Sequence, residues 1–460
     1  MTYLQAIRFL DSFVNYEKIS NWTYKKSIKL KRIQSLLDQI GNPQNVLKCV
    51  HVAGSKGKGS TCAFIANILR YSGFKVGLYT SPHLVDFRER IRILEPEVSK
   101  YQSVKESGRR SDGGSRDFEG MISRNDLVDL VQRVKPDIKV YNKKSKFGPL
   151  TFFEVYTALA FLYFKEQDVD FVVLETGMGG RLDATNVVDP YVCVLTPISY
   201  EHTQKLGNTL SKIAFEKAGI IKGRKVTKLQ SHKETRIRCK GVKVSGCQKV
   251  NVISAPQEKE AMGVFEERCA KNKAELIKIK ENDFRDLKVN LIGDHQKINA
   301  ACAVEAVKAL SCYGIKIKDE DIRKGLLATR WPCRCEVVSK NPLFILDGAQ
   351  NSASVKVLIN AIKKNFKYKS VILILGISDD KDIEGICRQL NNFADTVVVT
   401  KANNPRAADP QRLAKYFSQK NILLTKNTRM AKNKALKIAE KGDLILVTGS
   451  LFVTGEFKKI

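Results

Sequence analysis

The sequence lacks the marks of a membrane-spanning or disulfide-stapled protein. No run of 18 apolar residues occurs among its 460 residues, which argues against a transmembrane helix. Its 11 cysteines form no CxxC pair, and the closest two, Cys333 and Cys335, are separated by one residue, so neither a zinc ribbon nor a disulfide framework is indicated. The first residues carry Asp11 within an apolar run and no basic leader. We therefore expect a soluble protein of the reducing cytoplasm.

Acidic residues are scarce relative to basic ones. The chain has 79 Lys and Arg but 48 Asp and Glu, giving a formal net charge of +31 at pH 7. Such an excess favours anionic partners without choosing among nucleotides, polycarboxylates, nucleic acid and acidic lipid. A nucleic-acid-binding P-loop protein is one hypothesis, and the basic stretch 222–249 supports it. That stretch has little aromatic interleaving and no recognised nucleic-acid motif, so a solvated lysine-rich surface is the favoured interpretation.

Composition and periodicity predict two folded α/β domains. Apolar residues make up 43% of the chain, and short β-branched runs alternate with helical patterns, as in doubly wound sheets. We expect a P-loop-type domain at 1–329 and a smaller Rossmann-like domain at 330–460, because Pro332 interrupts regular structure between them. Polar stretches near 95–120 and 223–249 are predicted surface insertions. The predicted strands cover 46–53, 75–79, 171–174, 191–195, 343–346, 371–375, 396–400 and 444–447.

The clearest local pattern is a strand, a glycine-rich turn and a helix. An apolar run ends at Ala53, GSKGKGS follows at 54–60, and helical periodicity continues from there. Glycines let backbone N–H groups approach a phosphate, and Lys58 can reach the terminal phosphates. The strict Walker A pattern has Ser or Thr directly after Gly-Lys, whereas here Gly59 intervenes before Ser60. The pattern predicts a nucleotide-binding loop, with a glycine-rich linker turn as the alternative.

Two further segments place polar residues after predicted strands. FVVLETGMGGRLDATN puts Glu175 at the carboxyl edge of a sheet, where it could hold Mg²⁺, with Arg181 and Asp183 available for polar contacts. The segment after the next strand contains His202 and Lys217. Each of these residues also has a purely structural interpretation: a sheet-edge carboxylate, a packing histidine and a solvated helix lysine.

Together these segments resemble the bifunctional dihydrofolate synthase and folylpolyglutamate synthase enzymes of the Mur ligase superfamily. The resemblance runs nearly end to end through ordered blocks, which include HVAGSKGKGSTCAFIANILR, GLYTSPHLVDFRERIRI, GPLTFFEVYTALAF, ETGMGGRLDATNVV, SYEHTQKLGNTLSKIAFEKAGIIK, GDHQKINAACAVEA, RWPCRCEVV, LDGAQN, DDKD, NPRAADP and TGSLFVTGE. It implies an ATP-dependent ligase in which a substrate carboxylate attacks the γ-phosphate and the amine of L-glutamate then displaces phosphate from the acyl phosphate. The implied acceptors are folylmonoglutamate, dihydropteroate, or both.

The resemblance also assigns roles to individual residues. The nucleotide-binding residues would be Gly54, Gly57, Lys58, Gly59, Ser60, Asn299, Arg334 and Asp347. The magnesium ions would be held by Ser81, Glu175, His202 and Lys217. The folate or glutamate substrates would contact Ser81, Pro82, His83, Phe152, Phe153, Arg181 and Gln350. The residues implied to act in catalysis are Lys58, Lys217, Arg334 and Asp347. Lys217, in EKAG, matches the lysine that the family carbamylates, which turns a cation into a carboxylate-like metal ligand.

Three positions depart from the family pattern. Lys56 stands where bacterial members usually have Asn in TNGKGS, as it often does in eukaryotic members, and we expect activity to survive. Cys333 replaces the Gly of WPGR, which is tolerable provided that the backbone there needs no positive φ. Gln350 replaces the His of DGAHN, which weakens any proposal that an imidazole at this position acts as a base.

An alternative within the superfamily is a ligase for another carboxylate and amino acid, such as a peptidoglycan precursor. The TSPHL and TFFE blocks favour a pterin substrate instead. The expected state is a monomer that binds ATP, Mg²⁺, L-glutamate and a folate or dihydropteroate, with no specific nucleic acid and no membrane as partners.

Overall fold

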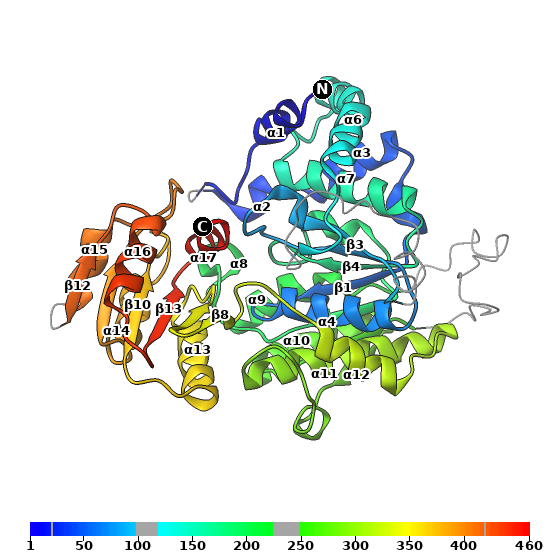
Figure 1. The fold of residues 1–460 in the computed structure, drawn as a ribbon. Coiled ribbons are helices and arrows are strands. Elements are labelled where there is room, and N and C mark those ends of the chain that lie inside the picture. Colours follow the sequence, from blue (N-terminus) through cyan, green and yellow to red (C-terminus); the bar gives the residue numbers. More distant parts are fainter. Residues whose placement is uncertain (20–21, 98–117, 224–248, 418–419) are drawn as a thin grey trace, which may run out of the picture. The chain divides into compact units, whose positions relative to one another are not determined.

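The computed structural model describes residues 1–19, 22–97, 118–223, 249–417 and 420–460 (Figure 1). The predicted insertions near 95–120 and 223–249 therefore lie largely outside the described residues. The chain divides into two compact α/β units. The first comprises Met1–His83, Phe87–Asn290 and Lys297–Thr329, and the second comprises Leu84–Asp86, Leu291–Gln296 and Arg330–Ile460.

The first unit is built on a seven-stranded sheet with the order β3-β2-β4-β1-β5-β6-β7. All neighbouring strands run parallel except the edge strand β3, which is antiparallel to β2. The strands are β1 (Cys49–Ala53), β2 (Val76–Tyr79), β3 (Ile91–Leu94), β4 (Phe171–Glu175), β5 (Val192–Leu195), β6 (Asn251–Ser254) and β7 (Glu275–Lys278). Every residue of β1, β2, β4 and β5 is buried, which explains their continuous apolar runs.

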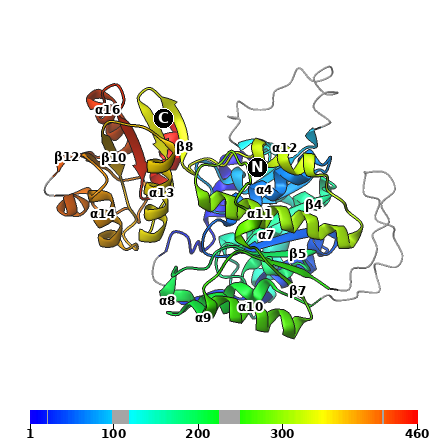
Figure 2. The same ribbon diagram turned by 90° about the horizontal axis from the view of Figure 1, so that it is seen from below.

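Helices cover both faces of this sheet, and others pack outside them. The helices of the first unit are α1 (Tyr3–Asp11), α2 (Tyr24–Ser27), α3 (Leu30–Gln39), α4 (Lys58–Tyr71), α6 (Arg124–Lys144), α7 (Phe152–Glu166), α8 (Thr203–Leu206), α9 (Leu210–Lys217), α10 (Lys259–Asn272) and α12 (Asp319–Ala328). Helix α11 (Asp294–Lys308) begins in residues of the second unit and continues into the first. Figure 2 shows α4, α11 and α12 on one side of the sheet and α9 and α10 on the other.

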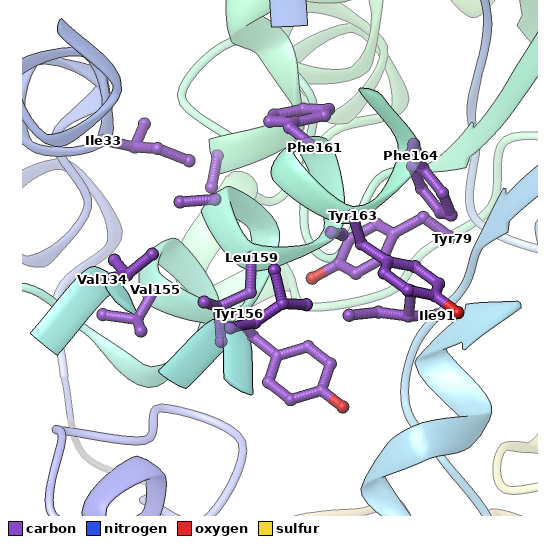
Figure 3. Packing of buried hydrophobic residues seen from close by; sticks show 14 of the residues in the cluster. Ile33, Tyr79, Ile91, Val134, Val155, Tyr156, Leu159, Phe161, Tyr163 and Phe164 are labelled. Carbon is purple, nitrogen blue, oxygen red and sulfur yellow. The ribbon is translucent and has the colours of Figure 1, made fainter. Parts of the chain in front are cut away.

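Helix α7 lies within a large apolar cluster of the first unit. Thr151 and Glu154 form a capping box at its start, which satisfies two backbone N–H groups that the helix leaves unpaired. Its side chains are apolar around almost the whole circumference because α3, α6 and the sheet surround it. Figure 3 shows Tyr156, Leu159 and Phe164 of this helix packed among the residues of its neighbours.

The second unit is a six-stranded sheet with the order β12-β11-β10-β13-β9-β8, in which only the edge strand β8 is antiparallel. The strands are β8 (Glu336–Lys340), β9 (Leu343–Leu346), β10 (Val371–Leu375), β11 (Thr396–Val399), β12 (Asn421–Leu424) and β13 (Leu444–Thr448). The helices are α13 (Ser352–Asn365), α14 (Ile383–Asn391), α15 (Pro410–Ala414), α16 (Thr428–Ile438) and α17 (Leu451–Lys459). Alternate residues of β10 enter two separate apolar clusters, so helices cover both faces.

The two α/β sheets predicted from the sequence are confirmed, with differences at their margins. Strand β1 begins at Cys49 rather than at residue 46, because a short 3₁₀ turn at Pro43–Val46 precedes it. Strands β3, β6, β7, β8 and β12 were not predicted from the sequence. Four of these are edge strands, which can be short and less continuously apolar than central parallel strands. No helix among the described residues combines the length and apolar character needed to cross a bilayer.

Candidate active site

Four parallel strands of the first unit end at the same edge of the sheet. Ala53 pairs with Leu195, Val52 with Glu175, and Tyr79 with Leu174. The residues that follow these strands are therefore neighbours, as expected for a ligand site of an open α/β sheet. One contact shows this directly, because the backbone N–H of Ser81 donates to Glu175 Oε2 at 3.0 Å.

The glycine-rich turn has a conformation that side chains would not permit. Gly54 has a φ of +151°, and a Cβ there would lie 1.9 Å from Thr196 Oγ1. Gly57 has a φ of +83°, and a Cβ there would lie 2.1 Å from Asn299 Oδ1. Helix α4 begins immediately afterwards, with Gly59 and Ser60 in its first turn. The start of this helix therefore presents backbone N–H groups at the edge where the strands end, which is a favourable place for an anion.

Two lysines converge on one backbone oxygen of this turn. Lys217 Nζ donates to the carbonyl of Gly54 at 2.7 Å, and Lys58 Nζ donates to the same oxygen at 3.1 Å. Lys217 is the last residue of α9 and its residue surface is only 2% exposed. Burial and, to a smaller extent, the nearby charge of Lys58 lower the pKa of Lys217 to about 7. An uncharged amine is thus well populated near neutral pH at this position.

A pair of charged residues that was not predicted from the sequence also lies at this edge. Lys56 Nζ is 3.2 Å from Glu201 Oε1. Burial alone would raise the pKa of Glu201, but Lys56, Lys58, His202 and Lys217 outweigh it and hold the pKa well below its usual range. Two features of the sequence could have indicated this pair. Lys56 adds a positive charge to the loop, and Glu201 directly precedes His202.

The residues implied to bind magnesium suit that ion only with help from other ligands. Among the described residues, no three His, Cys, Asp or Glu side chains lie close enough together to hold a metal. Mg²⁺ commonly takes one or two carboxylates and completes its shell with water and substrate phosphates, so Glu175 and the hydroxyl of Ser81 fit this chemistry. The hydroxyl of Thr176, buried beside Glu175, has no hydrogen-bond partner within the described part of the chain, as expected where a polar ligand belongs.

The segment that follows β2 is organised by a buried arginine. Pro82 follows Ser81 in a cis peptide bond, and His83 comes next. Arg90 is fully buried, and its Nε donates to His83 Nδ1 at 3.0 Å. Both terminal nitrogens of Arg90 donate to the carboxylate of Glu17, at 2.8 and 2.5 Å. His83 Nδ1 is therefore an acceptor, so its proton resides on Nε2 when the ring is neutral.

The two phenylalanines of TFFE differ in their surroundings. Phe152 is completely buried and packs beneath Arg90, whose guanidinium lies 5.3 Å from the ring centre. It has no exposed surface with which to meet a ligand in this structure, so its place in the site is one of support. Phe153 is partly exposed and lies against Gly177, where a Cβ would approach its ring to 2.7 Å. Phe153 is the better placed of the two to meet a substrate.

Arg181 joins the glycine-rich segment after β4 to helix α9. Its Nε and Nη2 donate to the two carboxylate oxygens of Glu216 at 3.1 and 2.8 Å. Its backbone N–H donates to the carbonyl of Glu216 at 2.7 Å. Because Glu216 directly precedes Lys217, this bidentate pair holds the end of α9 in place. The guanidinium is about one third exposed, so one face of it borders solvent.

A buried hydrogen-bond network holds the glycine-rich segment that follows β4. His51 Nε2 lies 2.8 Å from the hydroxyl of Thr185, which donates to Asp183 Oδ1 at 2.6 Å. The other oxygen of Asp183 accepts the backbone N–H of Met178 at 2.9 Å. Since the Thr185 hydroxyl uses its proton for Asp183, His51 donates from Nε2. His51 and Thr185 were not predicted, because neither forms a recognisable pattern with its sequence neighbours.

In the second unit, Asp347 organises the loop that contains Gln350. Its two oxygens accept the backbone N–H groups of Cys335 and Ala349, both at 2.7 Å. The guanidinium of Arg334 lies close to Gly348, where a Cβ would be 2.9 Å from Nη1. Gln350 is partly exposed and its backbone N–H donates to Ser354 Oγ at 3.2 Å.

The condition attached to Cys333 is not met in this loop. The replacement of the family's Gly is tolerable provided that the backbone needs no positive φ, but φ is +56° at Cys333 and +45° at Cys335. Both residues therefore occupy the left-handed region that favours glycine. The Cys333 side chain is fully buried in the apolar cluster of β9 and β13, so packing holds it in this conformation.

Comparison with known proteins gives consistent results over the whole chain. The Mur ligase middle domain model matches residues 138–307, and the Mur ligase, glutamate ligase domain model matches residues 333–451. The chain is 32% identical to the dihydrofolate synthase/folylpolyglutamate synthase of Bacillus subtilis, over 97% of this chain and 99% of that protein.

Solved structures resemble the chain equally broadly. The Mycobacterium tuberculosis folylpolyglutamate synthase complexed with ADP superposes with a TM-score of 0.81 at 26% identity, covering 99% of this chain and 97% of that one. Escherichia coli FolC in complex with DHPP and ADP superposes with a TM-score of 0.77 at 25% identity, covering 100% and 97%.

Proposed function

The chain belongs to the dihydrofolate synthase/folylpolyglutamate synthase family of ATP-dependent Mur ligases, and we propose that it attaches L-glutamate to a folate and to dihydropteroate. The observation that carries this proposal is the meeting of Gly54, Lys58, Lys217 and Glu175 at one sheet edge. A ligase of this class must hold triphosphate and metal where it activates a carboxylate. The comparisons favour this function over a ligase for another carboxylate or a nucleic-acid-binding protein.

We infer that the phosphates of ATP lie on residues 54–60. The ADP complexes of the similar structures support nucleotide binding, and the two glycines that admit no side chain support its placement on this turn. Lys58 would exchange its bond to the carbonyl of Gly54 for a phosphate oxygen and so reduce the negative charge that develops during transfer. Asn299 packs directly behind Gly57 and would set the position of the loop relative to the base.

Magnesium would be held by Ser81, Glu175, His202 and a carbamylated Lys217. When bound, Mg²⁺ neutralises charge on the phosphates. For carbamylation, the uncharged amine of Lys217 attacks the carbon of CO₂, a C–N bond forms, and one amine proton passes to solvent. The pKa of about 7 supports this proposal because the reactive form of the amine is available near neutral pH.

The acceptor would bind beside His83 and Phe153. Arg90 fixes the imidazole of His83 by hydrogen bonding to Nδ1, and Glu17 fixes Arg90 in turn. A planar, polar pterin ring suits the imidazole of His83 and the partly exposed ring of Phe153. The similar structure that contains DHPP supports a ligand of this class.

We also propose the roles that the resemblance implies for Arg334, Asp347 and Gln350. Asp347 already binds two backbone N–H groups, so its contribution would include holding the loop that presents Arg334 and Gln350. We further propose that the protein acts as a monomer in the cytoplasm.

An ADP-release assay tests the proposed function. Purified protein is given Mg-ATP and L-glutamate with either dihydropteroate or tetrahydrofolate, and mass spectrometry checks that the product has gained one glutamyl residue. We expect ADP release that requires both glutamate and an acceptor. Release that depends on a different acceptor class, or no acceptor-dependent release at all, would contradict the proposal.

A further inference from the structure

The phosphate loop, residues 54–60, contacts the segment that precedes His202 through backbone and side-chain hydrogen bonds. The backbone N–H groups of Ser55 and Lys56 both donate to the carbonyl of Pro197, at 3.1 and 3.2 Å. The hydroxyl of Ser55 donates to the carbonyl of Ser199 at 3.0 Å. Ser55 and Lys56 are therefore held by hydrogen bonds against the segment that connects β5 to α8.

The ion pair between Lys56 and Glu201 completes this attachment. The two charged atoms lie 3.2 Å apart, and the side chains are only 30% and 13% exposed, so water screens the pair less than it would at an open surface. Lys56 lies in the loop on which the phosphates are placed, but neither its side chain nor that of Glu201 has been assigned a contact with ATP or Mg²⁺. The pair links residues 145 positions apart, so it depends on the fold and not on local sequence.

Glu201 is also the counter-charge for a crowded group of bases. Its carboxylate lies in the field of Lys56, Lys58, Lys217 and His202. Lys58 and Lys217 already share the carbonyl oxygen of Gly54. Without Glu201, the positive charges of Lys56 and Lys58 would be less compensated, and their mutual repulsion would oppose the compact arrangement of the loop.

The backbone beside Glu201 needs such an anchor. His202 has φ +51° and ψ +37°, in the left-handed region that non-glycine residues rarely adopt. A conformation of this kind persists only when surrounding contacts hold it. Because Glu201 is the residue directly before His202, fixing its side chain restricts the direction in which the imidazole can point.

We propose that Lys56 and Glu201 act as one positioning unit, which sets the phosphate loop and His202 relative to each other before the metal–nucleotide complex binds. Lys56 and Glu201 are positioning residues, since they act through the loop and through His202. The inference rests on the proposed placement of the nucleotide on residues 54–60. It also explains how the loop accommodates a second lysine, because the added charge is paired.

A double-mutant cycle tests this proposal. Lys56→Met, Glu201→Gln and the double variant are compared with the natural protein by calorimetric titration with ADP, once with Mg²⁺ and once with EDTA. The quantity of interest is the gain in ADP affinity that Mg²⁺ provides, because a simple change of net charge affects both titrations. We expect each single substitution to reduce this gain by about tenfold, and the double variant to lose no more than the worse single one.

Lys324→Met is the matched control, since it removes the lysine of an exposed ion pair with Glu320 on α12. It should leave the gain unchanged. Thermal unfolding of each variant checks the fold, and Lys56→Arg with Glu201→Asp repeats the cycle while retaining both charges; this conservative double variant should recover most of the gain.

If the fold losses of the two single variants multiply in the double variant, the two residues act independently. That result would overturn the proposal and show that Lys56 contacts the phosphates independently. Failure of the conservative pair to recover the gain would count against it as well. If the natural protein bound no ADP in either titration, the proposed nucleotide site would itself be wrong, and the inference with it.

Discussion

The amine of Lys217 lies 2.7 Å from the carbonyl oxygen of Gly54, so the end of α9 touches the first residue of the phosphate loop. The two residues are 163 positions apart in the chain. This contact places a buried lysine of lowered pKa where a triphosphate is proposed to bind, which gives physical support to a role that was implied only by resemblance.

Lys217→Ala is expected to reduce ligation by at least about 1,000-fold while the protein remains folded, because the change removes the group proposed to become a negatively charged metal ligand, worth several kcal/mol. Steady-state ADP release and circular dichroism measure the two effects. Added bicarbonate should not restore activity, since no amine remains to react. Lys212→Ala, on the exposed side of the same helix, is the control; undiminished turnover by the Lys217 variant would refute the assignment.

Gly57→Ala is expected to weaken ADP binding by at least about tenfold, because the new Cβ would clash with Asn299 Oδ1 and φ is +83°. Isothermal titration with ADP measures the effect. Gly263→Ala is the control, since a Cβ there meets no atom within 4 Å, and it should bind ADP normally. Equal affinities in the two variants would contradict the proposed loop.

Glu17→Gln is expected to raise the KM for the pterin-bearing acceptor by about five- to tenfold and to change the KM for ATP by less than about twofold, because Arg90 would hold His83 less firmly. Initial rates with each substrate varied in turn separate the two constants. Asp11→Asn breaks an exposed ion pair with Lys18 and serves as the control. An effect confined to ATP would contradict the placement of the acceptor.

The stability of the protein is expected to fall as the pH drops below 6.5, partly through His51. Burial lowers the pKa of His51 to about 3, so below pH 6.5 the unfolded chain takes up a proton that the folded chain does not. At pH 5 this difference amounts to about 2 kcal/mol of lost free energy of unfolding. Chemical denaturation at pH 7.5 and pH 5 measures it, and His51→Gln should show a smaller pH dependence. A variant with the same pH dependence would refute the contribution of His51.

Gln350→His is expected to change catalytic efficiency by less than about tenfold, or about 1.4 kcal/mol, because glutamine can position a substrate or the loop but cannot titrate near neutral pH. Asp347→Ala should be far more damaging, since it removes the acceptor of two backbone N–H groups as well as a carboxylate beside Arg334. Comparison of kcat/KM for the two variants provides the test. An increase of several orders of magnitude in kcat/KM of the histidine variant would show that the natural protein has lost most of its ligase activity.

Local features of the sequence determined the central strands and the phosphate loop. A fully buried parallel strand is continuously apolar, and the glycines of GSKGKGS lie within one turn, so both patterns can be recognised without the rest of the chain. Edge strands such as β7 and β12 escaped prediction because their residues are partly polar and exposed. The positive φ of Cys333 escaped as well, because packing of the buried side chain, and not its intrinsic preference, holds that conformation.

Only the tertiary structure decided which side chains meet. The pairs Lys56–Glu201, Arg90–Glu17 and Arg181–Glu216 join segments that are separated by 145, 73 and 35 residues. Their formation depends on which strand ends the parallel crossovers bring to the same edge, and on the small spaces that remain between the loops there. Burial likewise separates Phe152 from Phe153, which are neighbours in sequence but differ in access to the site. Residue type and order determined the chemistry available to this protein, whereas the three-dimensional path of the chain determined which groups are paired, buried or presented to a ligand.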